Sequence, residues 1–162
     1  MKRILAPLLF LTLLFPSLAY GVSSKKLVQR DGLWYERSAQ VPFTGKTTGL
    51  TQATLKNGVL DGPFIKLYSN GQLMYQIEYK NGKKHGPIIQ YSYEGKLFSI
   101  GNYQDDKMHG RFTKYYTKNG QVMSDGNFID DEKDGRWVSF NRDGTKDEVL
   151  SGIYKNGKKI HD

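Results

Sequence analysis

Residues 62–82 read Gly-Pro-Phe-Ile-Lys-Leu-Tyr-Ser-Asn-Gly-Gln-Leu-Met-Tyr-Gln-Ile-Glu-Tyr-Lys-Asn-Gly, and they contain the clearest structural signal in the chain. Two runs rich in β-branched and aromatic residues, 64–68 and 73–79, flank Asn70-Gly71, and Asn81-Gly82 follows the second run. Asn-Gly is the strongest short-range hairpin signal because both residues tolerate positive φ. The stretch therefore predicts a β-hairpin that is closed by a second tight turn.

The same pattern returns along the chain with a nearly constant period. The leading glycines are spaced by 24, 24 and 25 residues, at Gly62, Gly86, Gly110 and Gly135. A turn glycine follows each of them by nine or ten residues, at Gly71, Gly95, Gly120 and Gly144. A unit of this size buries its apolar face only by stacking on its neighbours. Since no stretch shows a helical period, the sequence predicts an all-β fold of tandem β-hairpin repeats in one elongated, twisted antiparallel sheet.

Strand alternation divides the repeated positions between two faces. Two residues after each leading glycine lie Phe64, Ile88, Phe112 and Trp137, and five residues after it, on the opposite face, lie Leu67, Tyr91, Tyr115 and Phe140. Glycines also recur near the ends of the second strands, at Gly101, Gly126 and Gly152. Glycine inside a strand often marks a close approach, so we expect aromatic rings from a neighbouring strand to lie across the backbone there.

These repeats resemble the variant form of the MORN repeat. The resemblance rests on the unit Gly-x-Phe/Trp-x-x-Tyr-Tyr-x-x-Asn-Gly-x-Leu/Val and extends over about residues 27–161. The upstream segments 31–35 and 42–49 resemble the leader of bacterial YwqK-type MORN proteins that carry an antitoxin label. The resemblance implies a sheet of hairpins that serves as a scaffold, as a protein-binding surface or as a lipid-binding surface. Ser92 and Asn141 depart from it where Tyr68 and Tyr116 stand, and an insertion after Gly144 predicts a distorted end cap.

The first residues have the pattern of a secretory signal peptide. A basic start at Lys2-Arg3 precedes an apolar run over 4–15, and Ala19 and Gly21 supply the small residues of a cleavage site. We therefore expect export after cleavage behind Gly21, to the periplasm or the medium. A retained membrane anchor is the alternative, but it needs about 20 apolar residues. The predicted division is a signal peptide at 1–21, a leader hairpin or half repeat at 22–49, and the repeat array at 50–162.

Catalytic and metal-binding patterns are missing from the sequence. The chain has no cysteine, which excludes disulfides, thiol nucleophiles and cysteine-based zinc sites. His85 and His109 occupy the slot held by Asp61 and Asp134 in other units, which indicates a turn-capping role. The acidic cluster 130–134 lacks the spacing of a calcium loop and is interpreted as a solvated loop. The sequence predicts no enzyme, no metal and no cofactor.

Two kinds of partner remain. The favoured one is a protein, held along an aromatic face or a strand edge, and the resemblance implies an antitoxin-like role for such a contact. The candidate residues for this contact are Tyr68, Tyr91, Tyr115, Tyr116 and Phe140. The alternative is an anionic lipid or envelope polymer, because residues 22–120 carry 15 basic and 7 acidic side chains. The candidate residues for one basic edge are Lys80, Lys83, Lys84, Lys107, Arg111, Lys114 and Lys118. Lysines that only keep an exposed sheet soluble explain the same pattern, and export disfavours a nucleic acid.

Overall fold

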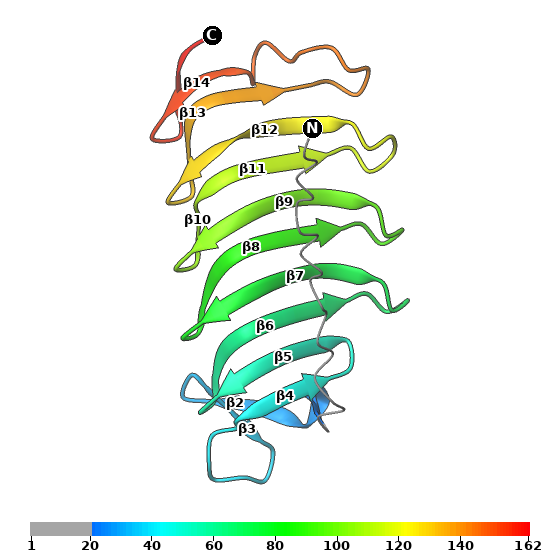
Figure 1. Cartoon of the computed structure of the whole chain (residues 1–162), viewed down its shortest axis with the longest axis vertical. Helices are drawn as coiled ribbons and strands as arrows, with labels where there is room; N and C mark the ends of the chain where they lie inside the picture. Colours follow the sequence, from blue (N-terminus) through cyan, green and yellow to red (C-terminus); the bar gives the residue numbers. More distant parts are fainter. Residues whose placement is uncertain (1–20) are drawn as a thin grey trace, which may run out of the picture.

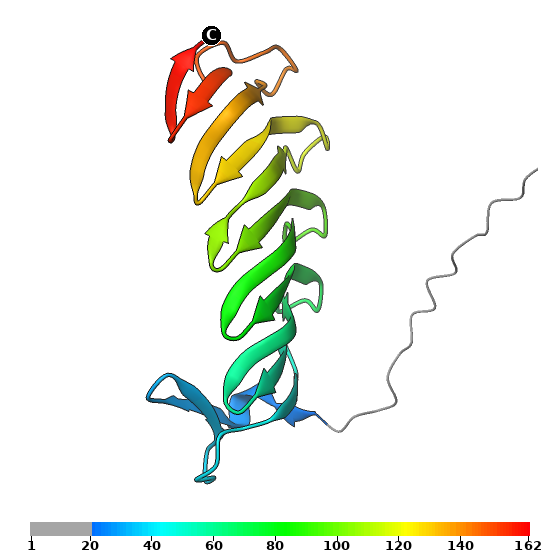
Figure 2. The ribbon, with the colours of Figure 1, turned by 60° about the vertical axis from the view of Figure 1, so that its left-hand side comes forward.

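A computed structural model describes residues 21–162, and it contains one long sheet. The predicted signal peptide, apart from Gly21, lies outside the described residues. The sheet has 13 strands, and from β4 onwards the strands stack in chain order along one long axis (Figure 1). The stack twists along this axis (Figure 2). The described residues contain no α-helix, only a three-residue 3₁₀ turn at Ser24–Lys26. The predicted all-β hairpin array is therefore confirmed.

The strands fall into three groups along the chain. The N-terminal segment contains β1 (Val22–Ser23), β2 (Leu27–Arg30), β3 (Leu33–Glu36) and β4 (Gly45–Thr48). The array contains β5 (Thr51–Lys56), β6 (Val59–Leu67), β7 (Leu73–Lys80), β8 (Lys83–Tyr91), β9 (Leu97–Gln104), β10 (Lys107–Met108), β11 (Gly110–Tyr115), β12 (Val122–Ile129) and β13 (Glu132–Ser139). The C-terminal end contains β14 (Gly152–Lys155) and β15 (Lys158–His161).

The leader is divided between two sheets. Strands β2 and β3 form a separate two-stranded sheet, whereas β4 pairs with β5 and begins the antiparallel part of the long sheet. The backbone N–H of Trp34 donates to Gly58, which ties the small hairpin to the first turn of the array. The predicted leader at 22–49 thus includes the first strand that joins the array.

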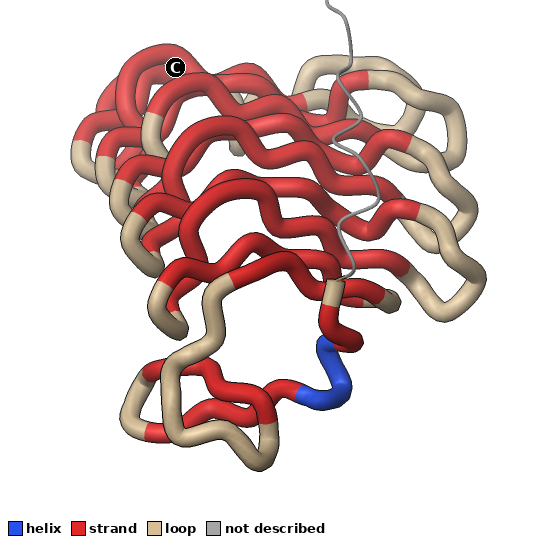
Figure 3. Tube along the Cα trace, turned by 60° about the horizontal axis from the view of Figure 1, so that its bottom comes forward, coloured by secondary structure: helices blue, strands red, loops and turns tan. Residues whose placement is uncertain are grey.

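Turns of two kinds follow the two long edges of the sheet, and the strands between them curve (Figure 3). At the tight-turn edge both central residues have positive φ, as at Asn81 (50°) and Gly82 (81°). Asp105-Asp106 and Asp130-Asp131 adopt the same turn. The long-turn edge carries the longer connections 68–72, 92–96 and 116–121, and a turn over 141–145 that the Phe140–Lys146 bridge closes within the connection 140–151.

The aspartates of the tight turns also link successive repeats. The backbone N–H of Asp131 donates to the Met108 carbonyl, and the Asp131 carboxylate accepts the Met108 N–H at 2.7 Å. Asp106 makes the same pair of bonds with Lys84, at 2.9 Å to its carboxylate. The interpretation of residues 130–134 as a solvated loop was wrong, because the first two residues form a hydrogen-bonded turn and the others belong to β13.

One face of the sheet holds most of the core. Strand pairing places on it Phe64, Tyr75, Ile77, Tyr79, Ile88, Tyr103, Phe112, Phe128, Trp137 and Tyr154, and we call it the aromatic face. Ile77 and Trp137 are only 1% and 2% exposed. Burial raises the pKa of the Tyr75, Tyr79 and Tyr103 hydroxyls, which fits this packing. Residues between these positions form the opposite face, which carries Ile65, Ile89, Ile100, Thr113, Asp125 and Val138.

Two of the three predicted contacts between glycines and rings are present. A Cβ atom on Gly126 would lie 2.2 Å from the Trp137 ring, and one on Gly101 would lie 2.9 Å from Phe112. The expectation was wrong at Gly152, where the nearest groups are the His161 carbonyl and the Lys159 side chain. The reason is that this glycine lies in the C-terminal unit, where β15 replaces a full repeat.

The fourth unit is distorted, as the insertion predicted. Strands β7, β9 and β12 each have eight residues, whereas β14 has four. A loop over 140–151 takes the place of the missing half strand, and it is anchored by hydrogen bonds between Ser139 and Ser151 at 2.9 and 3.2 Å. The Tyr154 hydroxyl donates to the Leu150 carbonyl at 3.0 Å. The loop is therefore tied to the end of the array.

Candidate functional site

A hollow on the opposite face brings together two of the five predicted partner-binding residues. Tyr115 and Phe140 line it with Ile100, Val122 and Val138, and its volume is about 670 Å³. Ile100 is 39% exposed, and no second layer covers this side of the sheet in the part of the chain that the structure describes. We call this surface the Tyr115 hollow.

A charged group borders the Tyr115 hollow. The Arg111 guanidinium donates to both carboxylate oxygens of Asp125, at 3.0 and 3.2 Å, and the Thr113 hydroxyl donates to the same carboxylate at 2.7 Å. Partial burial acts to raise the pKa of Asp125, but the hydrogen bonds from Arg111 and Thr113 outweigh it, so the pKa is lowered. The carboxylate is therefore held in its charged form beside an apolar surface.

Tyr68 and Tyr116 have a structural role that could not be inferred from the sequence. The Tyr68 hydroxyl donates to the backbone carbonyl of Tyr91 at 2.9 Å, and the Tyr116 hydroxyl donates to that of Phe140 at 2.8 Å. Each bond joins one repeat to the next, across the long-turn edge. We call these two tyrosines the bridging tyrosines. Tyr91 provides an acceptor for one of them and does not line the Tyr115 hollow.

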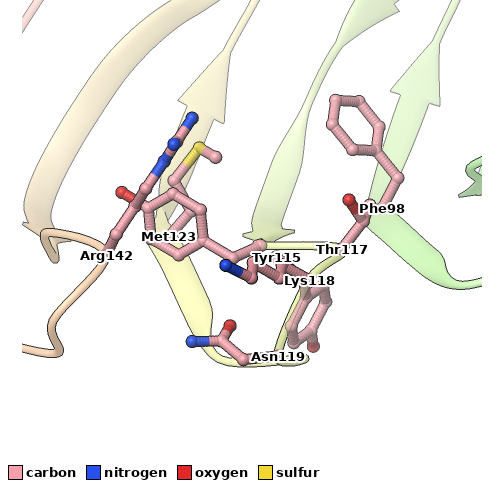
Figure 4. A pocket seen from close by; sticks show the side chains of 8 residues that line it. Phe98, Tyr115, Thr117, Lys118, Asn119, Met123 and Arg142 are labelled. Atoms are coloured by element: carbon pink, nitrogen blue, oxygen red, sulfur yellow. The ribbon is translucent and has the colours of Figure 1, made fainter.

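A second hollow lies on the other side of Tyr115. It has a volume of about 520 Å³ and is lined by Tyr115, Tyr116, Phe98, Met123 and Arg142, among others (Figure 4). Phe98 and Met123 each occupy the extra residue of a β-bulge, where the pairing register shifts. Sequence reasoning missed both residues because simple alternation assigns no face to a bulged position.

The predicted basic edge is not a single edge. The seven residues are separated because they occupy both turn edges and both faces of the sheet. Lys80, Lys83 and Lys107 lie beside the tight turns, and Lys118 lies in a turn at the long-turn edge. Arg111 is on the opposite face, paired with Asp125. Lys84 and Lys114 are on the aromatic face, with their ammonium groups 5.1 and 4.9 Å from the Tyr103 and Phe98 ring centroids.

Lysines are spread over the whole aromatic face. Lys66 and Lys133 lie there with Lys84 and Lys114, and the paired positions of that face in β6–β14 include no Asp or Glu. The Lys133 ammonium lies 4.5 Å from the Trp137 ring centroid, and burial lowers its pKa. The ammonium groups of Lys84, Lys114 and Lys133 thus lie over rings, and that of Lys66 donates to the Thr51 hydroxyl at 2.8 Å, while no carboxylate on this face pairs with these charges.

The histidines and Asp61 lie close to tight turns. Asp61 accepts the backbone N–H of Asn81 at 3.1 Å, which is the predicted capping bond. Nδ1 of His85 lies 3.7 Å from the Asp105 carboxylate, and Nδ1 of His109 lies 3.6 Å from that of Asp130. Each histidine therefore approaches an acidic turn residue of the next repeat, at more than hydrogen-bond distance. Residues 21–162 contain no group of three or more His, Cys, Asp or Glu placed to bind a metal ion.

Within the described residues, no helix has the length and apolar character that crossing a membrane requires.

Comparison with known proteins identifies the repeats. No curated protein matches the chain. Two segments, residues 60–81 and 84–105, match the family model described as MORN repeat variant. These segments begin on β6 and β8 and each include the following strand, so the matched unit is the structural repeat. MORN repeats generally bind or hold other molecules and are generally not catalytic. Residues 60–81 and 84–105 are thus similar to MORN variant repeats, and they lie within a longer array of similar hairpins.

Proposed function

We propose that this protein is exported and acts without catalysis, as a scaffold that binds a protein partner in the Tyr115 hollow. The observation that carries the proposal is the apolar floor of Ile100, Tyr115, Val122, Val138 and Phe140 on an uncovered face. An antitoxin-like protein, as the resemblance implies, would use such a surface to hold a toxin.

The composition of the Tyr115 hollow favours a protein partner. Binding energy at protein interfaces concentrates in buried aromatic and arginine anchors that a polar rim surrounds. Tyr115 and Phe140 supply the aromatic centre, and the Arg111–Asp125 pair supplies part of the rim. The terminal strand β15 is a weaker candidate for strand pairing, because it has four residues and begins with Lys158-Lys159. Lysines on a short edge oppose strand addition.

Photo-crosslinking in the producing cell tests the proposal. A benzoylphenylalanine at position 100 would lie on the floor of the hollow, and one at Gln76, exposed on the same face, is the control. We expect a discrete protein adduct from position 100 and none from position 76. The double variant Tyr115→Ala/Phe140→Ala should abolish the adduct. It should still be folded at the temperature of the experiment, as a cooperative unfolding transition would show. Equal adducts from both positions, or a folded double variant with an undiminished adduct, would contradict the proposal.

A second candidate function is binding to an anionic lipid or envelope polymer through the aromatic face. The specific observation is that Lys66, Lys84, Lys114 and Lys133 lie there without a carboxylate. Attraction between exposed charges is screened by salt, with a Debye length of about 10 Å at 0.1 M. The fraction of protein that co-sediments with phosphatidylglycerol vesicles should therefore fall as the salt is raised from about 0.05 to about 0.5 M, because the Debye length shortens. The double variant Lys66→Gln/Lys114→Gln should also co-sediment less. Salt-independent sedimentation would exclude this mode.

A further inference from the structure

The three junctions between successive repeats differ at one position of the long-turn edge. At the first junction Tyr68 reaches the Tyr91 carbonyl, and its ring packs edge-on against Tyr93 with centroids 5.3 Å apart. At the third junction Tyr116 reaches the Phe140 carbonyl. Ser92 holds the equivalent position at the second junction. A serine is too short to reach the next repeat, so the Tyr115 carbonyl receives no tyrosine hydroxyl.

Ser92 is committed to its own turn. Its hydroxyl donates to the Glu94 carboxylate at 2.8 Å and accepts the Lys96 backbone N–H at 3.4 Å. At the first junction the ring that packs on Tyr68 belongs to Tyr93. The equivalent position in the next repeat is Thr117, which has no ring. Both halves of the aromatic contact are therefore absent from the second junction.

A gap opens at this junction, between the turns of two successive repeats. It has a volume of about 460 Å³ and is lined by Leu97 and Lys96 from one repeat and by Tyr115, Thr117 and Lys118 from the next, with Asn119 and Gly120 at its end. We call it the Ser92 gap after the residue that begins the turn preceding Lys96 and Leu97, although Ser92 itself does not line it. Tyr115 also forms a wall of the Tyr115 hollow, so the gap adjoins the surface proposed for the partner.

The charge around the Ser92 gap is one-sided. Lys96 and Lys118 are the only charged residues that line it, and both are exposed. Glu94 accepts the Ser92 hydroxyl and does not line the gap, although its carboxylate is near enough to Lys96 for the two charges to interact. A basic lining of this kind is complementary to an acidic segment.

We propose that the Ser92 gap binds a tyrosine side chain from an acidic segment of the protein partner, whose hydroxyl donates to the Tyr115 backbone carbonyl. The partner would thus supply the contact that Tyr68 and Tyr116 make within this chain. The proposal rests on the proposed function, because it names the chemistry of the same partner. It adds a source of specificity, since the Tyr115 carbonyl would favour a phenol over apolar groups that have no hydroxyl.

Binding of p-cresol, the side chain of tyrosine as a free molecule, tests the gap directly. In ¹⁵N-labelled protein we expect p-cresol to shift the amide signals of Lys96, Leu97 and Thr117, and toluene to shift them less at equal concentration. Ser92→Tyr should remove these shifts and raise the Tm by about 1–4 °C, because the chain then fills its own gap. Ser92→Ala leaves the gap open and is the matched control. Tyr68→Ser should create a second p-cresol site at Gln72 and Leu73.

Peptides extend the test to the acidic flanks. We expect Glu-Glu-Tyr-Glu-Glu to bind about two- to tenfold more tightly than the Phe peptide, which lacks the hydroxyl, and more tightly than Lys-Lys-Tyr-Lys-Lys. Ser92→Tyr should reduce this binding, and Ser92→Ala should not. Equal affinities for the Tyr and Phe peptides, or p-cresol shifts that persist in Ser92→Tyr, would overturn the inference.

Failure of this inference is distinct from failure of the proposed function. If Ser92→Tyr keeps the crosslinked partner at position 100 while Tyr115→Ala/Phe140→Ala loses it, the Ser92 gap is not a tyrosine site and the Tyr115 hollow remains the interface. If neither variant changes the adduct, both proposals fall.

Discussion

The two faces of the sheet come from alternate residues of the same strands, yet they differ in how closely their side chains pack. On the aromatic face, Trp137 lies over Gly126 with its ring centroid 4.9 Å from that of Phe128, and the Lys133 ammonium lies over the Trp137 and Tyr154 rings. On the opposite face, Ile100 is 39% exposed beside an open hollow, and Arg111 is 78% exposed. One face is packed against itself, and the other is left uncovered.

The contrast indicates that in a single-layer sheet one face supplies most of the packing and the other can bind a partner. A sheet without a second layer must bury apolar surface within one face, and large rings over glycines achieve this because they can lie flat on the backbone. The opposite face contributes less to the core, so its apolar residues can stay exposed and bind a partner. Substitutions should therefore change stability mostly on the aromatic face.

The largest expected effect is that of Trp137→Ala. Trp137 is 2% exposed, and its indole N–H donates to the Asn127 carbonyl at 2.9 Å. Truncation leaves a cavity and removes the hydrogen bond to the Asn127 carbonyl, so we expect a loss of about 3–5 kcal/mol in the free energy of unfolding. Phe140→Ala, on the less buried opposite face, should cost about 1–2 kcal/mol. Urea unfolding followed by tyrosine fluorescence measures both, and similar losses would remove the contrast between the faces.

A smaller loss of stability is expected from substituting the glycines over which aromatic rings lie. In Gly126→Ala the added methyl would lie 2.2 Å from Trp137, so the indole or the strand must move, at a cost of about 1–3 kcal/mol. Gly101→Ala, whose methyl would lie 2.9 Å from Phe112, should cost less. Neither glycine has a positive φ, so the pair isolates the steric contact. Thermal unfolding of the two variants checks the order, and a reversed order would contradict this account of the aromatic face.

The smallest effect concerns the Arg111–Asp125 pair on the opposite face. Because the pKa of Asp125 is lowered in the folded protein, the ion pair stabilises the fold above the ordinary value of 3.8. This contribution disappears as the pH falls through the lower pKa of the folded state. Arg111 is 78% exposed, so we expect only about 0.5–1 kcal/mol. Unfolding at pH 7 and pH 2.5 should show this difference in the wild type and not in Asp125→Asn; equal pH dependence would refute it.

The sequence predicted the repeat and its period because turn chemistry is local. Asn81-Gly82 marks a tight turn in any context, and the contacts of Phe112 with Gly101 and of Trp137 with Gly126 follow from regular pairing of adjacent strands. The position of Gly152 could not be predicted, because the C-terminal unit lacks the strand that would bring a ring. Asp130-Asp131 was misread because aspartate is a less specific turn signal than glycine, although its carboxylate completes the link to Met108.

The candidate site was predictable only in part. Tyr115 and Phe140 were placed on the correct face, since their spacing from the leading glycine is regular. Phe98 and Met123 were missed because each lies in a bulge, which interrupts the alternation. The seven basic residues do not form one edge, since neighbouring strands carry them to different edges and faces, although Lys80 and Lys83 pair across one tight turn.

The all-β fold, the length of the repeat and the exceptional position of Ser92 could be read from the chain alone, because they depend on local preferences and on comparison of one unit with the next. The hydrogen bonds of the tyrosine hydroxyls across the first and third junctions, and the gap at the second, became visible only in the folded protein. This is because the contacts of a side chain depend on which groups the next repeat places within its reach. Twist, bulges and register set that distance, and none of them is encoded at a single position.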